Sequence, residues 1–346
     1  MTLTPSTVAE VQGALAAATA DGTRIVPTGG GTRRRPVASP GGRLLSTAGL
    51  ADVLQHVPAE LTATVQSGVP VSAFAKLLED AGQWWPQADH RPGSTVGGVV
   101  AAAASSRHRL RYGPVRDSLL EVVLVTGDGR LVKGGGPTVK SVAGYDIPRL
   151  AAGSLGTVGV IVQVTVKLTP LPPLSEWFHA EEPLAERRAR ADEIARTTFR
   201  PEAILLTSRG LHVRLAGPSA DVLPPAGMTT STAPPEPAGD TMVHVGVPPA
   251  RLVEFVTRVD NLDVDYIAEF GTGICDVTVS DAATATEIAE SAVRLDGHAV
   301  ITTDGGAPAV HAAPRDPRLR AVEERLRAVF DPRGTLRPPD LLETAR

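Results

Sequence analysis

Two segments decide how this chain is interpreted: RPGSTVGGVVAAAASS (Arg91 to Ser106) and, later in the chain, AGSLGTVGV (Ala152 to Val160). A third segment of the same kind, PTGGGTRRR (Pro27 to Arg35), lies upstream. Side chains this small let backbone N–H groups approach an anion, and Ser and Thr hydroxyls add further donors. Three such segments in one half of the chain, each next to a predicted strand, indicate one long ligand with two anionic groups. A dinucleotide cofactor fits this description.

The common nucleotide-binding loops do not match. The dinucleotide fingerprint G-x-G-x-x-G needs a third glycine, and after Gly29 and Gly31 that position holds Arg34. The phosphate loop G-x-x-x-x-G-K-[ST] is absent from the sequence. The sequence therefore predicts that another kind of fold holds the cofactor.

The composition is that of a soluble globular protein. The chain has 346 residues, enough for two domains, with 42% hydrophobic and 21% charged residues. Its net charge of −4 points to neither nucleic acid nor an acidic membrane surface. The N-terminus lacks a secretory pattern, and the apolar run Val96 to Ala104 is too short to cross a bilayer. We expect a cytoplasmic protein without a transmembrane segment.

Cysteine and histidine usage argues against a metal centre. The single cysteine, Cys275, excludes an intramolecular disulfide and a cysteine-ligated iron–sulfur cluster. It lies in ICDVTVS, an alternating strand pattern, and so favours a buried structural thiol over a nucleophile. The eight histidines are scattered without metal-ligand spacing, so no metal site is expected.

In the first half, a capping box at Thr7-x-x-Glu10 starts a helix that ends near Gly22, and the strand 24–28 runs into the first glycine loop. The patterns predict further strands at 61–65 and 158–168, a helix over 71–82, and a hairpin over 121–133 around Gly127-Asp128-Gly129. The break at Pro170, Pro172 and Pro173 is the predicted domain boundary.

The alternating strand and helix patterns in the second half of the sequence predict an antiparallel sheet with helices on one face. The segment 218–239, rich in Pro, Ala and Thr, is predicted to be a mobile loop. A final amphipathic helix is expected around Leu319, Val322, Leu326 and Val329. The other predicted helices cover 184–197, 251–259 and 282–293, and the predicted strands 203–207, 211–215, 242–247, 264–268 and 274–280.

The ordered motifs PTGGGT, PGSTVGG, RYGPVRD, KSVAGYD and GSLGTVGVI strongly resemble the vanillyl-alcohol-oxidase (PCMH) type of FAD-binding domain, over roughly Val8 to Leu168. The ending RLRAVFDPRGTLRPP resembles that family's closing helix and turn. In its length and its KSVAGYD motif, the chain resembles more narrowly the small FAD-binding subunits of bacterial glycolate oxidases. The resemblance implies an α+β fold: a two-part PCMH-type FAD-binding domain over 1–170, then a smaller antiparallel-sheet-plus-helices domain over 171–346. This second domain would be a substrate or cap-like domain and would include the C-terminal helix.

The resemblance also assigns FAD-binding residues on the three loops. The first loop would wrap the pyrophosphate, the second would run beside pyrophosphate and flavin, and the third would hold the adenosine and ribityl side. Gly144 and Asp146 would shape the loop before the third. The residues so assigned are Thr28, Gly29, Gly30, Gly31, Thr32, Pro92, Gly93, Ser94, Thr95, Gly97, Gly98, Gly144, Asp146, Gly153, Ser154, Gly156, Thr157, Gly159 and Ile161.

Several positions depart from the family pattern. No His or Cys stands in the first loop or near Ala101 to Ser106, where relatives with covalent flavin attach it, so noncovalent FAD is expected. Thr28 replaces the Arg of many relatives, and Arg33-Arg34-Arg35 replaces small residues. The Asn common before RYG is missing, and the closing NPG reads Arg337-Pro338-Pro339.

Oxidation of a 2-hydroxy acid needs a cation for the carboxylate and a base for the hydroxyl proton, beside the flavin. The basic stretch from Arg107 to Arg116 is either a solvated loop or a rim that attracts an anionic substrate or partner. Candidates are His108, Arg109 and Arg111 for the cation and His311 or His90 for the base.

Three hypotheses about function stay open. The first is an FAD-dependent oxidoreductase subunit for a 2-hydroxy acid, working with a larger flavoprotein and an iron–sulfur subunit. The second is an FAD-binding relay or scaffold subunit without its own substrate chemistry. The third is a self-sufficient flavin alcohol oxidase.

Overall fold

The chain divides into two compact units, and each unit is made of three separate segments of the sequence. Unit 1 is Met1–Ser106, Pro114–Leu171 and Asp316–Pro339, and unit 2 is Arg107–Gly113, Pro172–Arg315 and Asp340–Arg346. The computed structural model describes residues 2–32, 42–136, 144–237, 239–303, 309–312 and 317–336. Each unit is described by itself.

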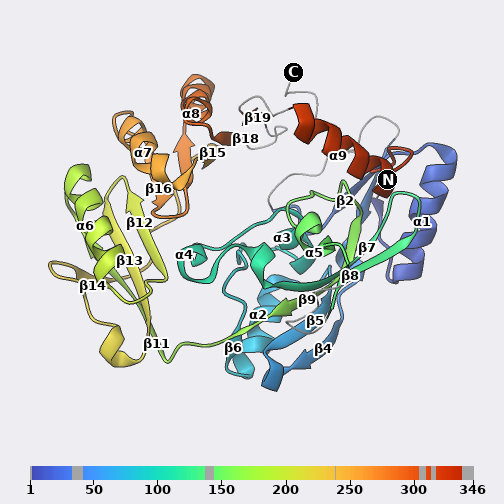
Figure 1. Ribbon diagram of the computed structural model, residues 1–346, viewed down its shortest axis with the longest axis horizontal. Helices are drawn as coiled ribbons and strands as arrows, with labels where there is room; N and C mark the ends of the chain where they lie inside the picture. The colour runs from blue at the N-terminus through green and yellow to red at the C-terminus, as the bar shows by residue number, and fades with distance from the viewer. Residues whose placement is uncertain are drawn as a thin grey trace. The chain divides into compact units, whose positions relative to one another are not determined.

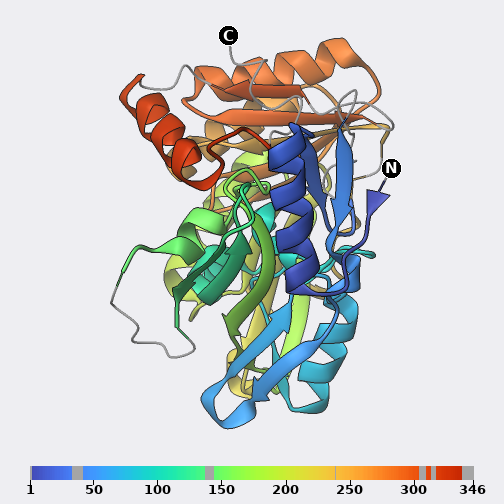
Figure 2. The ribbon, with the colours of Figure 1, turned by 90° about the vertical axis from the view of Figure 1, so that its right-hand side faces the viewer.

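Unit 1 begins with a helix that its sequence caps at both ends. Helix α1 follows Thr7, whose hydroxyl accepts a hydrogen bond from the Glu10 N–H, and it stops at Gly22 with φ of 76°. Val11 and Leu15 are fully buried. Figure 2 shows the helix, in dark blue, beside the blue strands that follow it in the chain. The described helices of unit 1 are α1 (Val8–Asp21), α2 (Val71–Asp80), α3 (Val96–Ala101), α5 (Ile147–Ala151) and α9 (Pro317–Phe330).

Within the residues of unit 1 that the structure describes, the β-structure consists of two small sheets and one five-stranded sheet. Strands β1, β3 and β2 pair in parallel, and β10 pairs with β6. The larger sheet has the order β4-β5-β9-β7-β8 and is antiparallel throughout. The strands are β1 (Thr2–Leu3), β2 (Ile25–Thr28), β3 (Arg43–Ser46), β4 (Val53–Val57), β5 (Thr62–Gln66), β6 (Gln83–Trp84), β7 (Leu119–Val125), β8 (Leu131–Gly135), β9 (Val160–Lys167) and β10 (Thr169–Pro170).

The C-terminal helix α9 packs with unit 1, whereas the sequence assigned it to the second domain. Phe330 is buried in the same apolar cluster as Phe74 of α2 and Val99 of α3. Its carbonyl accepts a hydrogen bond of 2.9 Å from the N–H of Gly127, in the turn of the β7–β8 hairpin. An apolar stripe predicts that a helix is amphipathic, but it does not identify the surface that the stripe covers.

Unit 2 is built around one nine-stranded sheet of order β14-β11-β13-β12-β16-β17-β15-β18-β19, antiparallel at every pairing (Figure 1). Its helices are α4 (Arg109–Tyr112), α6 (Leu184–Thr197), α7 (Leu252–Asp260) and α8 (Ala282–Arg294). Its strands are β11 (Leu174–Ala180), β12 (Ala203–Thr207), β13 (Gly210–Gly217), β14 (Thr229–Ser231), β15 (Thr241–Gly246), β16 (Asp265–Glu269), β17 (Ile274–Val279), β18 (His298–Thr303) and β19 (Ala309–Ala312).

The two faces of this sheet differ in chemistry. One face packs its apolar side chains, including Phe178 and Val213, under helices α6, α7 and α8. Cys275 lies on that face and is fully buried, which confirms the structural thiol, and burial raises its pKa. The opposite face carries the polar side chains of His179, His212 and Glu269 beside a small apolar cluster of Ala203, Leu205 and Ile267. We call it the polar face.

The segment 218–239 differs from its prediction as a loop. It contains β14, which pairs antiparallel with β11 through Trp177 and Ser231. Strand β11 itself begins directly after the Pro-rich break. Short edge strands rich in Thr carry little hydrophobic periodicity, so their pattern resembles that of a loop.

Candidate functional site

The first two glycine loops of unit 1 lie against each other. A Cβ built on Gly30 would overlap the carbonyl oxygen of Gly93, and one built on Gly29 would overlap Thr95 Oγ1. The hydroxyls of Thr32 and Ser94 are 3.1 Å apart and share a hydrogen bond. Segments about sixty residues apart in sequence therefore meet here only because glycine lets the backbones approach.

The second loop is held from behind by the segment after β5. The N–H of Gly97 donates to Ser67 O at 2.8 Å, and the N–H of Val71 donates to Ser94 O at 2.9 Å. A Cβ on Gly97 would overlap Ser67 Cβ, so Gly97 is small because protein packs against it. Thr95 caps α3 by accepting a hydrogen bond of 3.2 Å from the Gly98 N–H.

The third loop lies on the end of α3. The N–H of Gly153 donates to Val100 O at 3.0 Å, and the N–H of Leu155 donates to Ala101 O at 2.8 Å. Gly156 has φ of 79°, and a Cβ there would lie 3.0 Å from Pro27 Cγ at the end of β2. All three loops predicted from the sequence therefore meet within unit 1, and we call this group of loops the cradle.

Several residues assigned to FAD also have roles in packing. A Cβ on Gly159 would overlap Leu124, and Ile161 is buried in the apolar cluster of the five-stranded sheet. Asp146 caps α5 by accepting from the Arg149 N–H at 3.1 Å, and Gly144 is exposed with φ of 100°. The predicted residues Arg33, Arg34 and Arg35, the motif residues 140–143 and Arg337-Pro338-Pro339 lie outside the described residues.

The cradle has the donor set that a diphosphate needs. Of its described loop residues 28–32, 92–98 and 153–157, the first range supplies the backbone N–H groups, since those of 153–157 are bonded within unit 1. The hydroxyls of Thr28, Thr32, Ser94, Ser154 and Thr157 add to them. Such backbone concavities bind phosphate without a cluster of Lys or Arg. None of the residues in these three ranges is His or Cys, the side chains that attach flavin covalently in relatives. The residues present fit FAD.

The basic stretch 107–113 belongs to unit 2, where acidic side chains surround it. Arg107 contacts Glu236 at 2.6 Å, Asp276 at 3.5 Å and Glu269 at 3.8 Å. Burial opposes the charge of Arg107, but the Glu236 hydrogen bond and the nearby carboxylates outweigh it and raise the pKa. Burial raises the pKa of Glu269 to about 7, even though Arg107 lowers it.

A second group of charges forms around Glu202, whose side chain is fully buried. Arg214 Nε lies 3.1 Å from its carboxylate, His108 Nδ1 lies 3.5 Å away, and Tyr112 donates its hydroxyl at 2.9 Å. Burial disfavours the charged form, yet His108 and Arg214 outweigh it and lower the pKa of Glu202. Burial, with the Glu202 charge, raises the pKa of Tyr112. The buried cluster anchors the stretch 107–113 to the sheet of unit 2.

The predicted catalytic candidates have different surroundings within their own units. His108 lies beside Glu202, and Arg111 donates to Ala216 O at 2.6 Å and stacks over Tyr112. Arg109 is half-buried in α4, and its charge lowers the pKa of Glu269. His90 is exposed in unit 1, and the backbone of His311 in β19 pairs with Ala299. The buried Glu202, Glu269 and Asp276 carry no sequence signal, because their partners are distant along the chain.

Across the ranges that the structure covers, no cluster of three or more His, Cys, Asp or Glu side chains is arranged to bind a metal. Among the helices it describes, none combines the length and the apolar character that a membrane span requires.

Comparisons with known proteins agree with the cradle. Residues 1–135 match the family of the FAD binding domain. Glycolate oxidase subunit GlcE of Escherichia coli K12 is 33% identical over 175 residues, 49% of this chain and 49% of that protein. D-2-hydroxyglutarate dehydrogenase of Xanthomonas citri pv. viticola is 33% identical over 221 residues, 62% of this chain and 47% of that protein. The chain thus spans about half the length of these curated relatives.

A solved structure of alkyldihydroxyacetonephosphate synthase superposes on 98% of this chain and 76% of that one, with a TM-score of 0.68 and 15% identity. This similarity concerns the fold, and it confirms the α+β architecture with antiparallel sheets. The ordered loops, the cradle and the family match together identify an FAD binding domain in the first part of the chain, over residues 1–135.

Proposed function

We propose that the chain is an FAD-dependent oxidoreductase subunit that acts on the CH–OH group of a small 2-hydroxy acid. The observation that carries this is the meeting of the three small-residue loops in the cradle. The relatives named glycolate oxidase subunit and D-2-hydroxyglutarate dehydrogenase support the substrate class. In this proposal the protein is cytoplasmic and works with a larger flavoprotein and an iron–sulfur subunit.

The chain's own residues bind and orient the cofactor. FAD, when bound, accepts the electrons that leave the substrate carbon. The backbone of Gly29–Gly31 and the hydroxyls of Thr32 and Ser94 would hold the pyrophosphate, and residues 153–157 the adenosine and ribityl side. The absence of His and Cys in the described loop residues supports noncovalent binding.

A second candidate is an FAD-binding relay or scaffold subunit without its own substrate chemistry. The contacts of His108 with Glu202 and of Arg111 with Ala216 O favour this candidate. Side chains already paired in this way are less available to bind a substrate carboxylate. A self-sufficient flavin alcohol oxidase is the remaining alternative.

The first test is cofactor identity. The purified chain is denatured and passed through a filter that retains protein. We expect FAD, at about one per chain, in the filtrate. Flavin retained with the polypeptide would contradict noncovalent binding, and FMN in the filtrate would contradict a dinucleotide cofactor.

The second test separates the candidates. The lone chain and the chain with its co-purified partners are assayed with glycolate, D-lactate and D-2-hydroxyglutarate and an artificial electron acceptor. We expect turnover of a 2-hydroxy acid only in the complex, and its loss when this subunit is omitted. Full turnover without this subunit's flavin would favour the scaffold, and turnover of simple alcohols by the lone chain would favour the oxidase.

A further inference from the structure

One arginine in the basic stretch 107–113 of unit 2 differs from its neighbours. Arg107, His108 and Arg111 are held by protein partners. Arg109 is half-buried, and no hydrogen bond or ion pair engages it within the part of the chain that the structure describes. None of its nitrogens is both buried and unpaired, in contrast to Arg107 Nη1 and Arg111 Nε. The unpaired donors of Arg109 therefore reach the molecular surface, where a ligand can contact them.

A second accessible group is His244 of β15, on the polar face. Its side chain is 45% exposed, and its Nδ1 lies 2.6 Å from the carboxylate of Asp276, its register partner on β17. A carboxylate only accepts hydrogen bonds, so Nδ1 carries a proton and Nε2 of the neutral ring is the acceptor. Among the described residues Nε2 has no hydrogen-bond partner, and it is not buried. Asp276 thus orients an imidazole whose accepting nitrogen is open to solvent.

Arg109 and His244 lie near the same carboxyl group, that of Glu269 on β16. Leu110, next to Arg109, lies beside the turn that follows β16, where a Cβ built on Gly271 would be 2.9 Å from Leu110 Cδ1. Burial raises the pKa of Glu269 to about 7, and the charges of Arg109 and His244 are among those that lower it. The two groups therefore border one area of the polar face.

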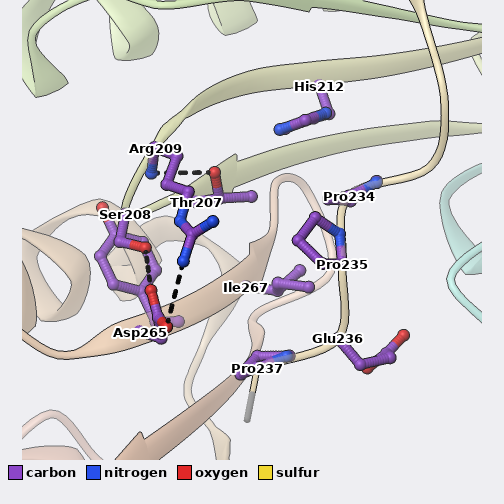
Figure 3. Close-up of a pocket in the computed structure, with 11 residues that line it drawn as sticks. Thr207, Ser208, Arg209, His212, Pro234, Pro235, Glu236, Pro237, Asp265 and Ile267 are labelled. Atoms are coloured by element: carbon purple, nitrogen blue, oxygen red, sulfur yellow. Dashed lines mark hydrogen bonds and ion pairs between the residues drawn. The ribbon is translucent and has the colours of Figure 1, made fainter.

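Arg107 already engages the acids of this area. Glu236 contacts its guanidinium at 2.6 and 3.3 Å, and Asp276 does so at 3.5 Å. Figure 3, a close-up of the neighbouring part of this face, shows the Glu236 carboxylate directed away from Ile267. No ion pair among the described residues engages Arg109 in the same way. An unpaired guanidinium favours an anionic ligand, and its planar fork fits a carboxylate.

We propose that Arg109 and His244 form a binding site for a small 2-hydroxy carboxylate, whose carboxylate contacts the Arg109 guanidinium and whose hydroxyl donates to His244 Nε2. Arg109 supplies charge and several donors, and His244 supplies one oriented acceptor. Both residues belong to unit 2. The choice of a 2-hydroxy acid rests on the proposed function, whereas binding is measured without turnover.

The test uses the full, flavin-loaded chain with ¹⁵N-labelled histidine, and three probes: glycolate, acetate and 1,2-ethanediol. We expect glycolate to shift the ring nitrogens of His244 in long-range ¹H–¹⁵N spectra. It should bind about three- to tenfold more tightly than acetate, which lacks the hydroxyl, and at least about tenfold more tightly than the diol, which lacks the carboxylate. Acetate binding equal to glycolate would overturn the contact with His244. Diol binding equal to glycolate would overturn the contact with Arg109.

Three variants give a second readout. Arg109→Gln removes the charge and should weaken glycolate binding at least about tenfold. Arg294→Gln, on α8 of the same unit, removes an exposed arginine paired with Glu290 at 3.7 Å and should leave binding unchanged. His244→Phe should lower glycolate affinity to that of acetate. Undiminished glycolate binding in a folded Arg109→Gln protein would refute the site, and should that variant fail to fold, the probe comparison on the unmodified chain still decides.

These readouts separate the site from the proposed function. Absence of the His244 shifts, with turnover of a 2-hydroxy acid by the complex retained, would overturn the site alone. The expected shifts without any turnover in the complex would support the site and contradict the proposed function alone.

Discussion

The cradle of unit 1 and the polar face of unit 2 are built by opposite means. The cradle is made of backbone and hydroxyls on three short, continuous segments, and its geometry depends on missing side chains. The polar face includes charged side chains from distant positions, such as Arg107 of the stretch 107–113 and Asp276 of β17, which lie 3.5 Å apart. A site of the first kind can be recognised from contiguous sequence motifs. A site of the second kind forms only when folding brings distant residues together.

The largest effect is expected from Gly30→Val, which tests the dependence of the cradle on missing side chains. The new Cβ would overlap Gly93 O, so the first two loops must separate. We expect at least a tenfold loss of bound flavin, measured by the ratio of absorbance at the flavin band to that of protein. Gly13→Ala in α1, where a Cβ meets no atom within 4 Å, is the control and should keep its flavin. Equal flavin content in both variants would show that the approach of the loops is dispensable.

The complementary change in unit 2 is Glu202→Gln. It leaves Arg214 and His108 beside a neutral amide in a fully buried position, and breaking a buried pair costs about 3–5 kcal/mol. We expect that loss in the free energy of unfolding of unit 2, measured by denaturant titration, while flavin content is retained. A loss below about 1 kcal/mol would mean that the buried cluster does not stabilise the sheet, since exposed pairs contribute no more than that.

Glu269 should make stability depend on pH in an unusual direction. Its folded pKa of about 7 lies above the ordinary 4.5, so the folded state binds more protons between these values, and stability falls as pH rises from 4.5 to 7. At 1.36 kcal/mol per pKa unit the fall is at most about 3 kcal/mol. His212, with a lowered pKa of about 4, acts oppositely, and its contribution is lost as pH falls below 6.5. Glu269→Gln should leave a stability that only rises over pH 4.5 to 7 in thermal melts. An unchanged pH profile would place the titration elsewhere.

The smallest effect is expected from Gly156→Ala. The residue has φ of 79°, and the added Cβ lies 3.0 Å from Pro27, so the cost should be about 1–2 kcal/mol. Melting temperature should drop by a few degrees. Flavin should remain bound with a modestly raised dissociation constant, measured by titration of the apoprotein with FAD. Complete loss of flavin would show that the cradle tolerates no added side chain at Gly156, contrary to the modest effect expected here.

The sequence predicts the local features of both units much better than the contacts between distant residues. Helix α6 has the bounds that its pattern predicts, and the β7–β8 hairpin forms where Gly127-Asp128-Gly129 indicates. These features depend on local periodicity and turn chemistry. The partners of Glu202 lie at 108, 112 and 214, and no periodicity relates them. Long-range pairs of this kind are set by strand register, which a single sequence does not reveal.

The stretch Arg107–Gly113 belongs to unit 2 although unit 1 residues flank it on both sides. Expression of residues 1–171 and 172–315 as separate polypeptides would therefore divide charge partners between them. The second polypeptide would retain buried Glu202 and Glu269 but lose His108, Tyr112 and Arg107, and the first would carry those groups without their acids. We expect neither fragment to match the stability of the whole chain, so this protein would resist division at its most obvious linker.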